Sequence, residues 1–337
     1  MTSPHFTLAA LAAAAVPGLA PTGVAESPDD PHEFESVVVF DDKRQRWRVR
    51  RPLTEQAAMR LETELQVLAG FTPSVKAGLP FRTPSVAGAV RQDQLRTFVY
   101  QDMPGAVLGL EELVAADART AQDIARAMAA IHGLDEQVVR EADLPAYTAE
   151  DVRTRRLNEL DQAATTGRIP PVLLRRWEAA LEEETLWRFE PVPVHGDLHE
   201  DNLLFERGRL VGVIGWTDLH IGDPAEDLAW LASADDPEFA ASLLQAYRER
   251  RDEGADASAP DPHLMRRATL AAEFALAQWL VRGVDRRDAT MIAEAEQMLA
   301  ELTAAVEAAE APRAGHETGP APTAQDAGAG QPGPRPA

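Results

Sequence analysis

The chain of 337 residues contains no cysteine and only two lysines. Without cysteine it cannot form disulfides, thiolate nucleophiles, or zinc and iron–sulfur sites that need cysteine ligands. The lysines, Lys43 and Lys76, both lie outside the G-K-[ST] context of a phosphate-binding P-loop. Nearly all of the 33 basic residues are therefore arginines, and only these two lysines could serve a site that requires a lysine.

The chain also has little positive charge and no long apolar run. Its formal net charge is -22 and its pI is about 4.7. Such an acidic surface repels phosphates, which argues against binding to nucleic acid. It either attracts a cationic substrate or simply keeps the protein soluble. No apolar run reaches the roughly 18 residues of a membrane-spanning helix, so we expect no membrane partner and a cytoplasmic location.

One apolar segment, Leu8–Ala20, resembles the core of a signal peptide. No lysine or arginine precedes it, and Pro17, Gly18 and Pro21 interrupt it or follow it. We expect a short helix and a turn that pack on the N-terminal part of the fold. Secretion remains the alternative.

The length and the order of elements predict two lobes. Two strands within residues 33–51, a helix at Leu53–Gly70, and strands at Val86–Arg91 and Leu95–Gln101 predict a small antiparallel sheet with one helix. We expect an α+β fold with an N-terminal lobe of residues 1–103, a helical lobe of residues 104–310 and a disordered tail of residues 311–337. The helices expected in the second lobe are Thr120–His132, Ala149–Ala164, Pro171–Trp187, Pro237–Arg251, Pro262–Val284 and Ala289–Ala308.

The segment Val192–Leu219 breaks the helical pattern. Short apolar runs flank the polar stretch HGDLHED, which predicts a loop followed by a β-hairpin. One interpretation is a metal site made by His195 and His199, but the neighbouring Pro193 and Gly196 disfavour the helix that this spacing needs. The other is a phosphoryl-transfer loop, because Asp197 and Asn202 have the D-x-x-x-x-N spacing of kinases.

Several motifs in series resemble one family. HGDLHEDNLL is similar to the H-G-D-x-x-x-x-N signature of aminoglycoside phosphotransferases, and VIGWTDLHIGDPAEDLAWL to their I-D-W/F…D-P-x-x-D segment. The W-T-D and G-D-P-A pieces, with RWRVRRP and ETELQVLAG upstream, most resemble the macrolide 2'-phosphotransferase branch. The matches keep one order over residues 33–250. They imply a two-lobed protein-kinase-like fold.

The resemblance also implies roles for individual residues. Asp197 would be the catalytic base and Asn202 a magnesium ligand. Arg50 stands where kinases place a phosphate-contacting lysine, and Glu64 on the helix that orients it; a solvated charge pair is the plainer alternative for both. The strand end that follows would contact the nucleotide base. Its residues are Val99, Tyr100 and Gln101.

The sequence departs from the family at Gly215, where the second metal-binding carboxylate is expected. Glycine offers no ligand, so the metal would be held more weakly. Asp218 is three residues further along and is the candidate replacement. Asp223 and Asp227 are expected to fix the loop structurally, and Trp216 and His132 to be packed in the core.

The functional expectation is a phosphotransferase that moves the γ-phosphate of ATP or GTP to a hydroxyl of a macrolide or related aminosugar antibiotic, with Mg²⁺ as cofactor, as in antibiotic resistance. One alternative is a kinase of another small hydroxylated metabolite. The other is a catalytically degenerate member that binds nucleotide. The expected partners are nucleotide and a small-molecule acceptor, with no nucleic acid and no membrane, and we expect a monomer.

Overall fold

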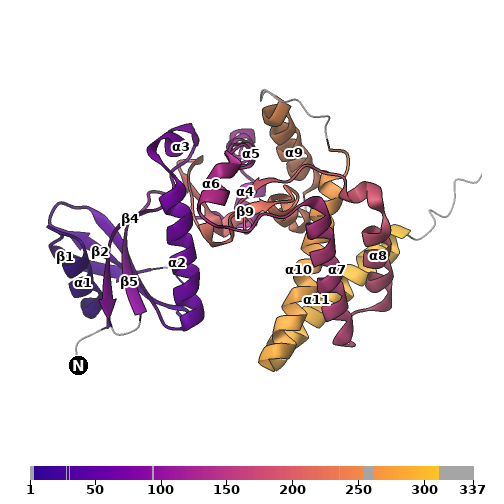
Figure 1. Cartoon of the computed structure of the whole chain (residues 1–337), viewed down its shortest axis with the longest axis horizontal. Helices are drawn as coiled ribbons and strands as arrows, with labels where there is room; N and C mark the ends of the chain where they lie inside the picture. The colour runs from indigo at the N-terminus through magenta and orange to yellow at the C-terminus, as the bar shows by residue number, and fades with distance from the viewer. Residues whose placement is uncertain are drawn as a thin grey trace, which may run out of the picture.

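A five-stranded antiparallel sheet forms the N-terminal part of this computed structural model (Figure 1). The structure describes residues 4–310, apart from positions 28, 30, 93–94, 235 and 253–260. The predicted tail of residues 311–337 lies outside the described residues. The strands follow the order β1-β2-β3-β5-β4. Their bounds are β1 Pro21–Glu26, β2 Phe34–Asp41, β3 Arg46–Pro52, β4 Ser85–Gln92 and β5 Leu95–Gln101.

Two helices cover the opposite faces of this sheet. Side chains alternate between the faces of a strand, so in β5 Phe98 and Tyr100 join the cluster that contains helix α2 (Glu55–Gly70). Val99, between them, joins the cluster on the other face, with helix α1 (Pro4–Ala15). The sheet is therefore buried on both sides.

The expected helix and turn within the apolar N-terminal segment are confirmed. Leu8 and Ala12 of α1 are fully buried against Val37, Val49 and other residues of the sheet. The turn that follows uses Gly18 at a φ of +79°.

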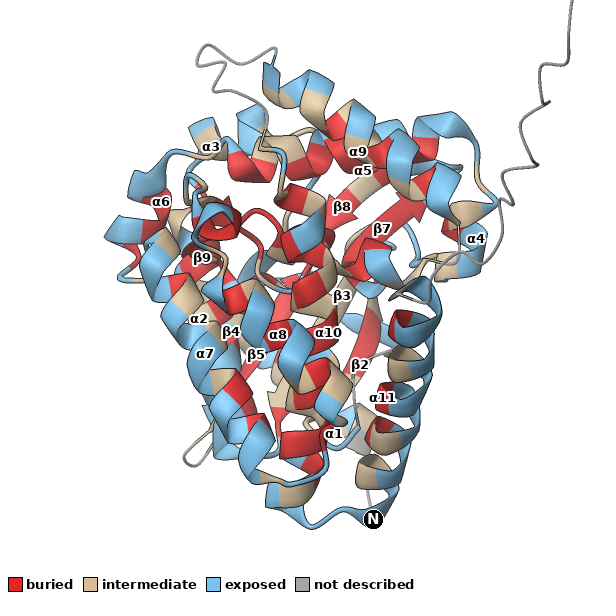
Figure 2. Cartoon of the chain, turned by 90° about the vertical axis from the view of Figure 1, so that its right-hand side faces the viewer, coloured by how far each residue is buried: buried red, intermediate tan, exposed pale blue. Residues whose placement is uncertain are grey.

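The rest of the chain is mostly helical, which confirms the predicted α+β class (Figure 1). One apolar core continues from α2 into this part, and a second lies among the last long helices around Trp177 and Phe274. Figure 2 shows that the buried faces of these helices turn inward and the exposed faces outward. The helices are α3 Pro73–Gly78, α4 Leu110–Val114, α5 Ala118–His132, α6 Glu136–Glu141, α7 Ala149–Thr165, α8 Pro171–Glu182, α9 Pro237–Asp252, α10 Leu264–Arg286 and α11 Ala289–Glu310. Among the described residues, no helix has both the length and the apolar character of a membrane span.

Two short strand pairs interrupt the helices, and the sequence indicated one of them. Strands β7 (Leu203–Glu206) and β8 (Arg209–Val213) form the predicted hairpin. Its turn residues, Arg207 and Gly208, have φ values of +52° and +72°, as a tight primed turn requires. Strand β6 (Val192–Val194) pairs with β9 (His220–Gly222). The polar loop between β6 and β7 is thereby held at both ends. The 3₁₀ helices of the described residues are η1 Glu184–Trp187, η2 Glu200–Asn202, η3 Trp216–Asp218 and η4 Glu226–Ser233.

Candidate active site

The polar loop from His195 to Asn202 is fixed by one buried carboxylate. Asp227 of η4 accepts hydrogen bonds from the backbone N–H of His195 at 2.8 Å and of Gly196 at 2.9 Å. Gly196 has a φ of +81°, and a Cβ there would overlap the carbonyl oxygen of Asp218. Only glycine therefore suits this sharp bend. The expected structural role of Asp227 agrees with this geometry.

Asp227 is itself held by a buried network. His132 Nε2 lies 3.0 Å from its carboxylate, and the other ring nitrogen lies 2.8 Å from the hydroxyl of Tyr247 in α9. Burial acts to raise the pKa of Asp227, but the His132 side chain and the backbone N–H of His195 offset this, and the pKa lies below its usual range. Asp227 therefore stays ionised, and the loop is tied to α5 and α9.

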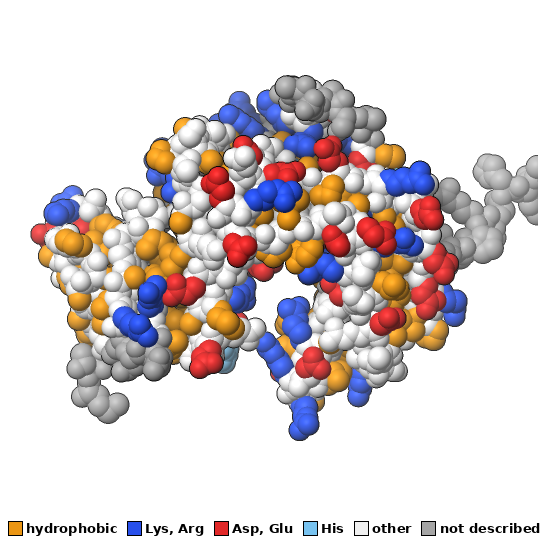
Figure 3. Space-filling model, in the orientation of Figure 1, with side chains coloured by type: hydrophobic (Ala, Val, Ile, Leu, Met, Phe, Trp, Pro, Cys, Tyr) orange, Lys and Arg blue, Asp and Glu red, His pale blue; other side chains and the backbone are white. Residues whose placement is uncertain are grey.

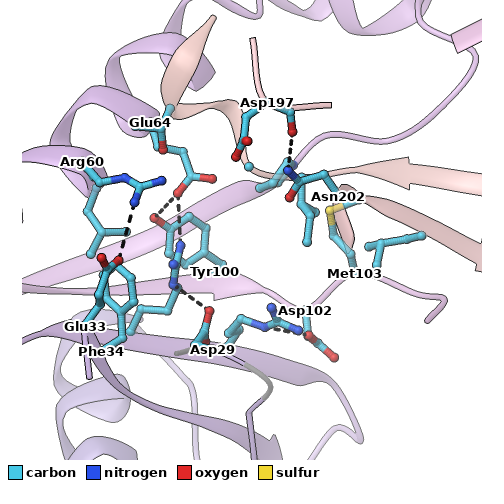
Figure 4. Close-up of a pocket in the computed structure, with 18 of the residues that line it drawn as sticks. Asp29, Glu33, Phe34, Arg60, Glu64, Tyr100, Asp102, Met103, Asp197 and Asn202 are labelled. Carbon is cyan, nitrogen blue, oxygen red and sulfur yellow. Dashed lines mark hydrogen bonds and ion pairs between the residues drawn. The ribbon is translucent and has the colours of Figure 1, made fainter. Parts of the chain in front are cut away.

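The loop brings Asp197 and Asn202 together. The Asn202 side-chain Nδ2–H₂ donates to the carbonyl oxygen of Asp197 at 2.7 Å, with His199 Nε2 at 3.2 Å. This orientation leaves the Asn202 Oδ1 without a bond to the loop. The Asp197 carboxylate is 47% exposed and lines a cavity together with Asn202 (Figure 4).

This first cavity, of about 280 Å³, lies between the sheet and the loop. Of the eight predicted site residues, it brings six together: Arg50, Glu64, Tyr100, Gln101, Asp197 and Asn202. Val99 is elsewhere, because its side chain is buried on the far face of the sheet against α1. Asp218 is also elsewhere, in the wall of a second cavity.

Glu64 connects the sheet, α2 and the segment after the hairpin. Its carboxylate accepts from Arg50 Nη1 at 3.2 Å and from the Tyr100 hydroxyl at 3.3 Å (Figure 4). It also accepts from the backbone N–H of Trp216. Burial raises the pKa of Glu64, and Arg50 partly opposes that. The predicted Arg50 and Glu64 thus form an ion pair in which Glu64 is buried and Arg50 is partly buried. The Tyr100 hydroxyl donates its hydrogen bond to Glu64.

Every arginine that lines the first cavity faces a carboxylate. Arg50 also contacts Asp29 (Nε to Oδ1, 3.1 Å) and lies 4.3 Å over the ring of Phe34. The other two such pairs are Arg48 with Asp102 at 3.6 Å and Arg60 with Glu33 at 3.7 Å. A phosphate that bound Arg50 would therefore compete with Asp29 for the same cation. Asp29 lies in the polar segment before β2, and no motif in the sequence indicates that it enters the cavity.

Gly215 is excluded as a metal ligand, and its backbone explains the glycine. It has a φ of +80°, and a Cβ there would lie 2.7 Å from the Asn202 Cγ. At the first cavity the loop places the Asn202 side chain and the Asp197 carboxylate, with His199 beside them. Among the described residues, no three acidic or histidine side chains gather in a way that could hold a metal ion. Gly215 thus leaves no carboxylate at the position where the resemblance implies the second magnesium ligand, and the alternative site at His195 and His199 gains no support.

Comparison with known proteins identifies relatives of the chain. The profile of a family described as "Phosphotransferase enzyme family" matches residues 28–263. Viomycin phosphotransferase of Streptomyces vinaceus is 33% identical over 205 residues, which cover 57% of this chain and 68% of that protein. YcbJ of Bacillus subtilis, described as uncharacterized, is 23% identical over 222 residues, which cover 64% of this chain and 72% of YcbJ.

Solved structures share the fold. The macrolide 2'-phosphotransferase MphH of Brachybacterium faecium has a TM-score of 0.72 at 22% identity, and the match covers 87% of this chain and 97% of that one. A GDP complex of aminoglycoside 2'-phosphotransferase-IIIa has a TM-score of 0.74 at 20% identity, with 91% and 100% covered. The kinase-like arrangement expected from the motifs is thereby confirmed.

Proposed function

The chain belongs to the phosphotransferase enzyme family, and from this premise we propose that it transfers the γ-phosphoryl group of ATP or GTP to a hydroxyl of a small aminosugar antibiotic such as a macrolide. The observation that carries the proposal is the loop of Asp197 and Asn202, which separates two cavities of similar size. Their volumes are close to the lower end for small-molecule sites.

In the proposed reaction, the nucleotide occupies the first cavity with its base near the end of β5. Its phosphates lie near Arg50, which gives up its contact with Asp29. The acceptor hydroxyl approaches from the second cavity and transfers its proton to Asp197. The acceptor oxygen bonds to the γ-phosphorus as the bond to the β–γ bridging oxygen breaks, and the nucleoside diphosphate leaves.

The acceptor class rests on the relatives. One relative is by name a viomycin phosphotransferase, and the structural neighbours include enzymes named for macrolides and aminoglycosides. The expected ATP or GTP donor is supported by the GDP bound in one neighbour. We further propose that residues 1–103 serve the nucleotide and residues 104–310 the acceptor, in a cytoplasmic monomer with access to cellular nucleotide.

A second candidate is a member of the family that binds nucleotide without transfer. Gly215 favours it, because the loop lacks the second ligand for magnesium. The pairing of Arg50 with both Asp29 and Glu64 also favours it, since it leaves less positive charge for phosphates.

The test is Asp197→Asn, which removes the proton acceptor and preserves the shape of the side chain. We expect kcat for the acceptor to fall by about 10²- to 10⁴-fold, the usual contribution of a general base, with nucleotide affinity unchanged. Asp201→Asn is the matched control, because Asp201 is on the same loop but 74% exposed. Near wild-type turnover in Asp197→Asn would show that Asp197 is not the base.

A further inference from the structure

The two cavities meet at one residue of η3. Thr217 lines both of them, and among the described residues no other does. The second cavity has a volume of about 290 Å³ and walls from α2, α7 and the residues around β9. Figure 3 shows the molecule hollowed between its sheet-containing part and its helical part, with charged side chains at the edge. A phosphoryl group that moves from a nucleotide in the first cavity to an acceptor in the second must therefore pass Thr217.

Helix α2 runs past this junction. Arg60 and Glu64 of α2 line the first cavity, and Thr63 lines the second. Residues three and four positions apart are neighbours on a helix surface, so Arg60 lies next to both Thr63 and Glu64. Glu64 also accepts from the backbone N–H of Trp216, the residue before Thr217. The helix therefore holds Arg60 beside the place where the cavities meet.

The positive charge of Arg60 acts on both sides of the junction. In the first cavity its Nη1 lies 3.7 Å from Glu33 (Figure 4). It also acts on Asp218 in the wall of the second cavity: burial, followed by the charge of Asp197, raises the pKa of Asp218, and Arg60 opposes this. A cation in this position can stabilise negative charge on a group that lies between the two cavities.

Arg60 is held less firmly than the other arginines of the first cavity. Arg50 is partly buried and contacts two carboxylates, and Arg48 faces a buried carboxylate at the end of β5. The Arg60 side chain is 46% exposed and its partner Glu33 is 34% exposed, and their separation is too long for a hydrogen bond. Exposed ion pairs of this kind contribute little to stability, so the Arg60 guanidinium is free to turn toward an anion.

We propose that Arg60 binds the γ-phosphoryl group of the nucleotide at the junction of the two cavities. The inference rests on the proposed function, which places the base near the end of β5 and the α- and β-phosphates near Arg50. The γ-phosphoryl group is the part of the nucleotide farthest from the base and therefore comes closest to the catalytic loop. The planar Arg60 guanidinium can donate two parallel N–H bonds to its oxygens, and its charge offsets theirs.

The test measures nucleotide binding to the full chain by calorimetry, at one magnesium concentration and without an acceptor. The probes are adenylyl and guanylyl imidodiphosphate, which carry a γ-phosphoryl group that is not transferred, and ADP and GDP, which lack it. Arg60→Gln should weaken the triphosphate analogues by about 10- to 100-fold, as for loss of a charged hydrogen bond, and leave the diphosphates unchanged. Arg60→Lys should restore part of the loss, because lysine keeps the charge but not the planar fork.

Two further variants serve as controls. Arg96→Gln changes the net charge by the same amount and also removes an ion pair with α2, since Arg96 lies 3.4 Å from Glu62. Arg96 lines neither cavity, so this variant should bind all the nucleotides as wild type does. Glu33→Gln releases Arg60, and its binding of the triphosphate analogues should be equal to that of wild type or tighter.

Other outcomes overturn the proposal. These are equal affinity of wild type and Arg60→Gln for the triphosphate analogues, equal weakening of triphosphates and diphosphates, the same selective loss in Arg96→Gln, or weaker triphosphate binding in Glu33→Gln. No binding of any nucleotide by wild type would overturn both this proposal and the proposed function. Selective loss in Arg60→Gln, with no phosphorylated acceptor from wild type, would support the Arg60 site and contradict only the proposed transfer.

Discussion

At the scale of single residues, the Asn202 side chain occupies the space that a side chain at position 215 would need. A carboxylate introduced at 215 could bind a metal ion only if the glycine were not needed for its backbone conformation. The structure shows that it is needed, because φ is +80° and the space for a Cβ is taken by the Asn202 amide. The local backbone conformation therefore requires glycine at the position where the family has a metal-binding carboxylate.

We predict that Gly215→Asp destabilises the protein and does not create a magnesium site. The positive φ alone costs about 1 kcal/mol or more for a residue with a Cβ, and Asn202 must also move. Gly208→Asp is the matched control, because Gly208 has a φ of +72° and open space around its Cβ position. Urea denaturation should therefore show the larger loss at 215.

Equal losses at 215 and 208 would mean that the contact with Asn202 is easily relieved. Tighter nucleotide binding with magnesium in Gly215→Asp would contradict the prediction directly. Calorimetry of nucleotide binding with and without magnesium measures that second point.

Residue roles could be predicted only where a motif carried them. The D-x-x-x-x-N spacing indicated Asp197 and Asn202 as site residues, and both line the first cavity in the structure. Asp29 and the Trp216 backbone N–H could not be predicted, because their contacts with Arg50 and Glu64 form only when distant segments meet. Val99 was predicted as a site residue, but the alternation of side chains along β5 buries it on the face of the sheet away from the cavity.

At the scale of elements, a helix or strand could be predicted from the sequence when it was long enough to show a periodic apolar pattern. The long amphipathic helices and the strands β2, β3, β4 and β5 were predicted from their apolar patterns. Strand β1 was missed because its sequence, PTGVAE, contains proline and glycine and is mostly exposed. Strands β6 and β9 have three residues each, too few for a pattern, so their pairing is a tertiary effect.

Helix α1 contributes to stability through one buried face. We predict that Leu8→Ala, at a fully buried position, lowers the free energy of unfolding by about 2–5 kcal/mol, as for other core leucines. The matched control is Phe6→Ala in the same helix, since Phe6 is 61% exposed and its loss should cost about 0.5 kcal/mol or less. Similar small losses in both variants, measured by urea denaturation, would mean that α1 is only loosely attached.

At the scale of the whole molecule, the order of motifs carried more information than any one of them. The motifs that follow one another over residues 33–250 implied the kinase-like fold by their resemblance to a family, and the family match over residues 28–263 and the solved structures that share the fold confirm it. The net charge of -22 did not predict the site, because most of the acids in each cavity lie against arginines of the same cavity. Which acid pairs with which arginine depends on the folded geometry and cannot be predicted from the net charge.

Transfer of the terminal phosphoryl group is the central claim, and it can be measured directly. The full chain is incubated with ATP or GTP labelled in the γ-phosphate, and separately with erythromycin, kanamycin and viomycin, in magnesium and in manganese. Mass spectrometry should find at least one acceptor carrying a single labelled phosphoryl group with wild type and none with Asp197→Asn. Nucleotide binding without any labelled acceptor across the panel would contradict transfer and favour the nucleotide-binding alternative.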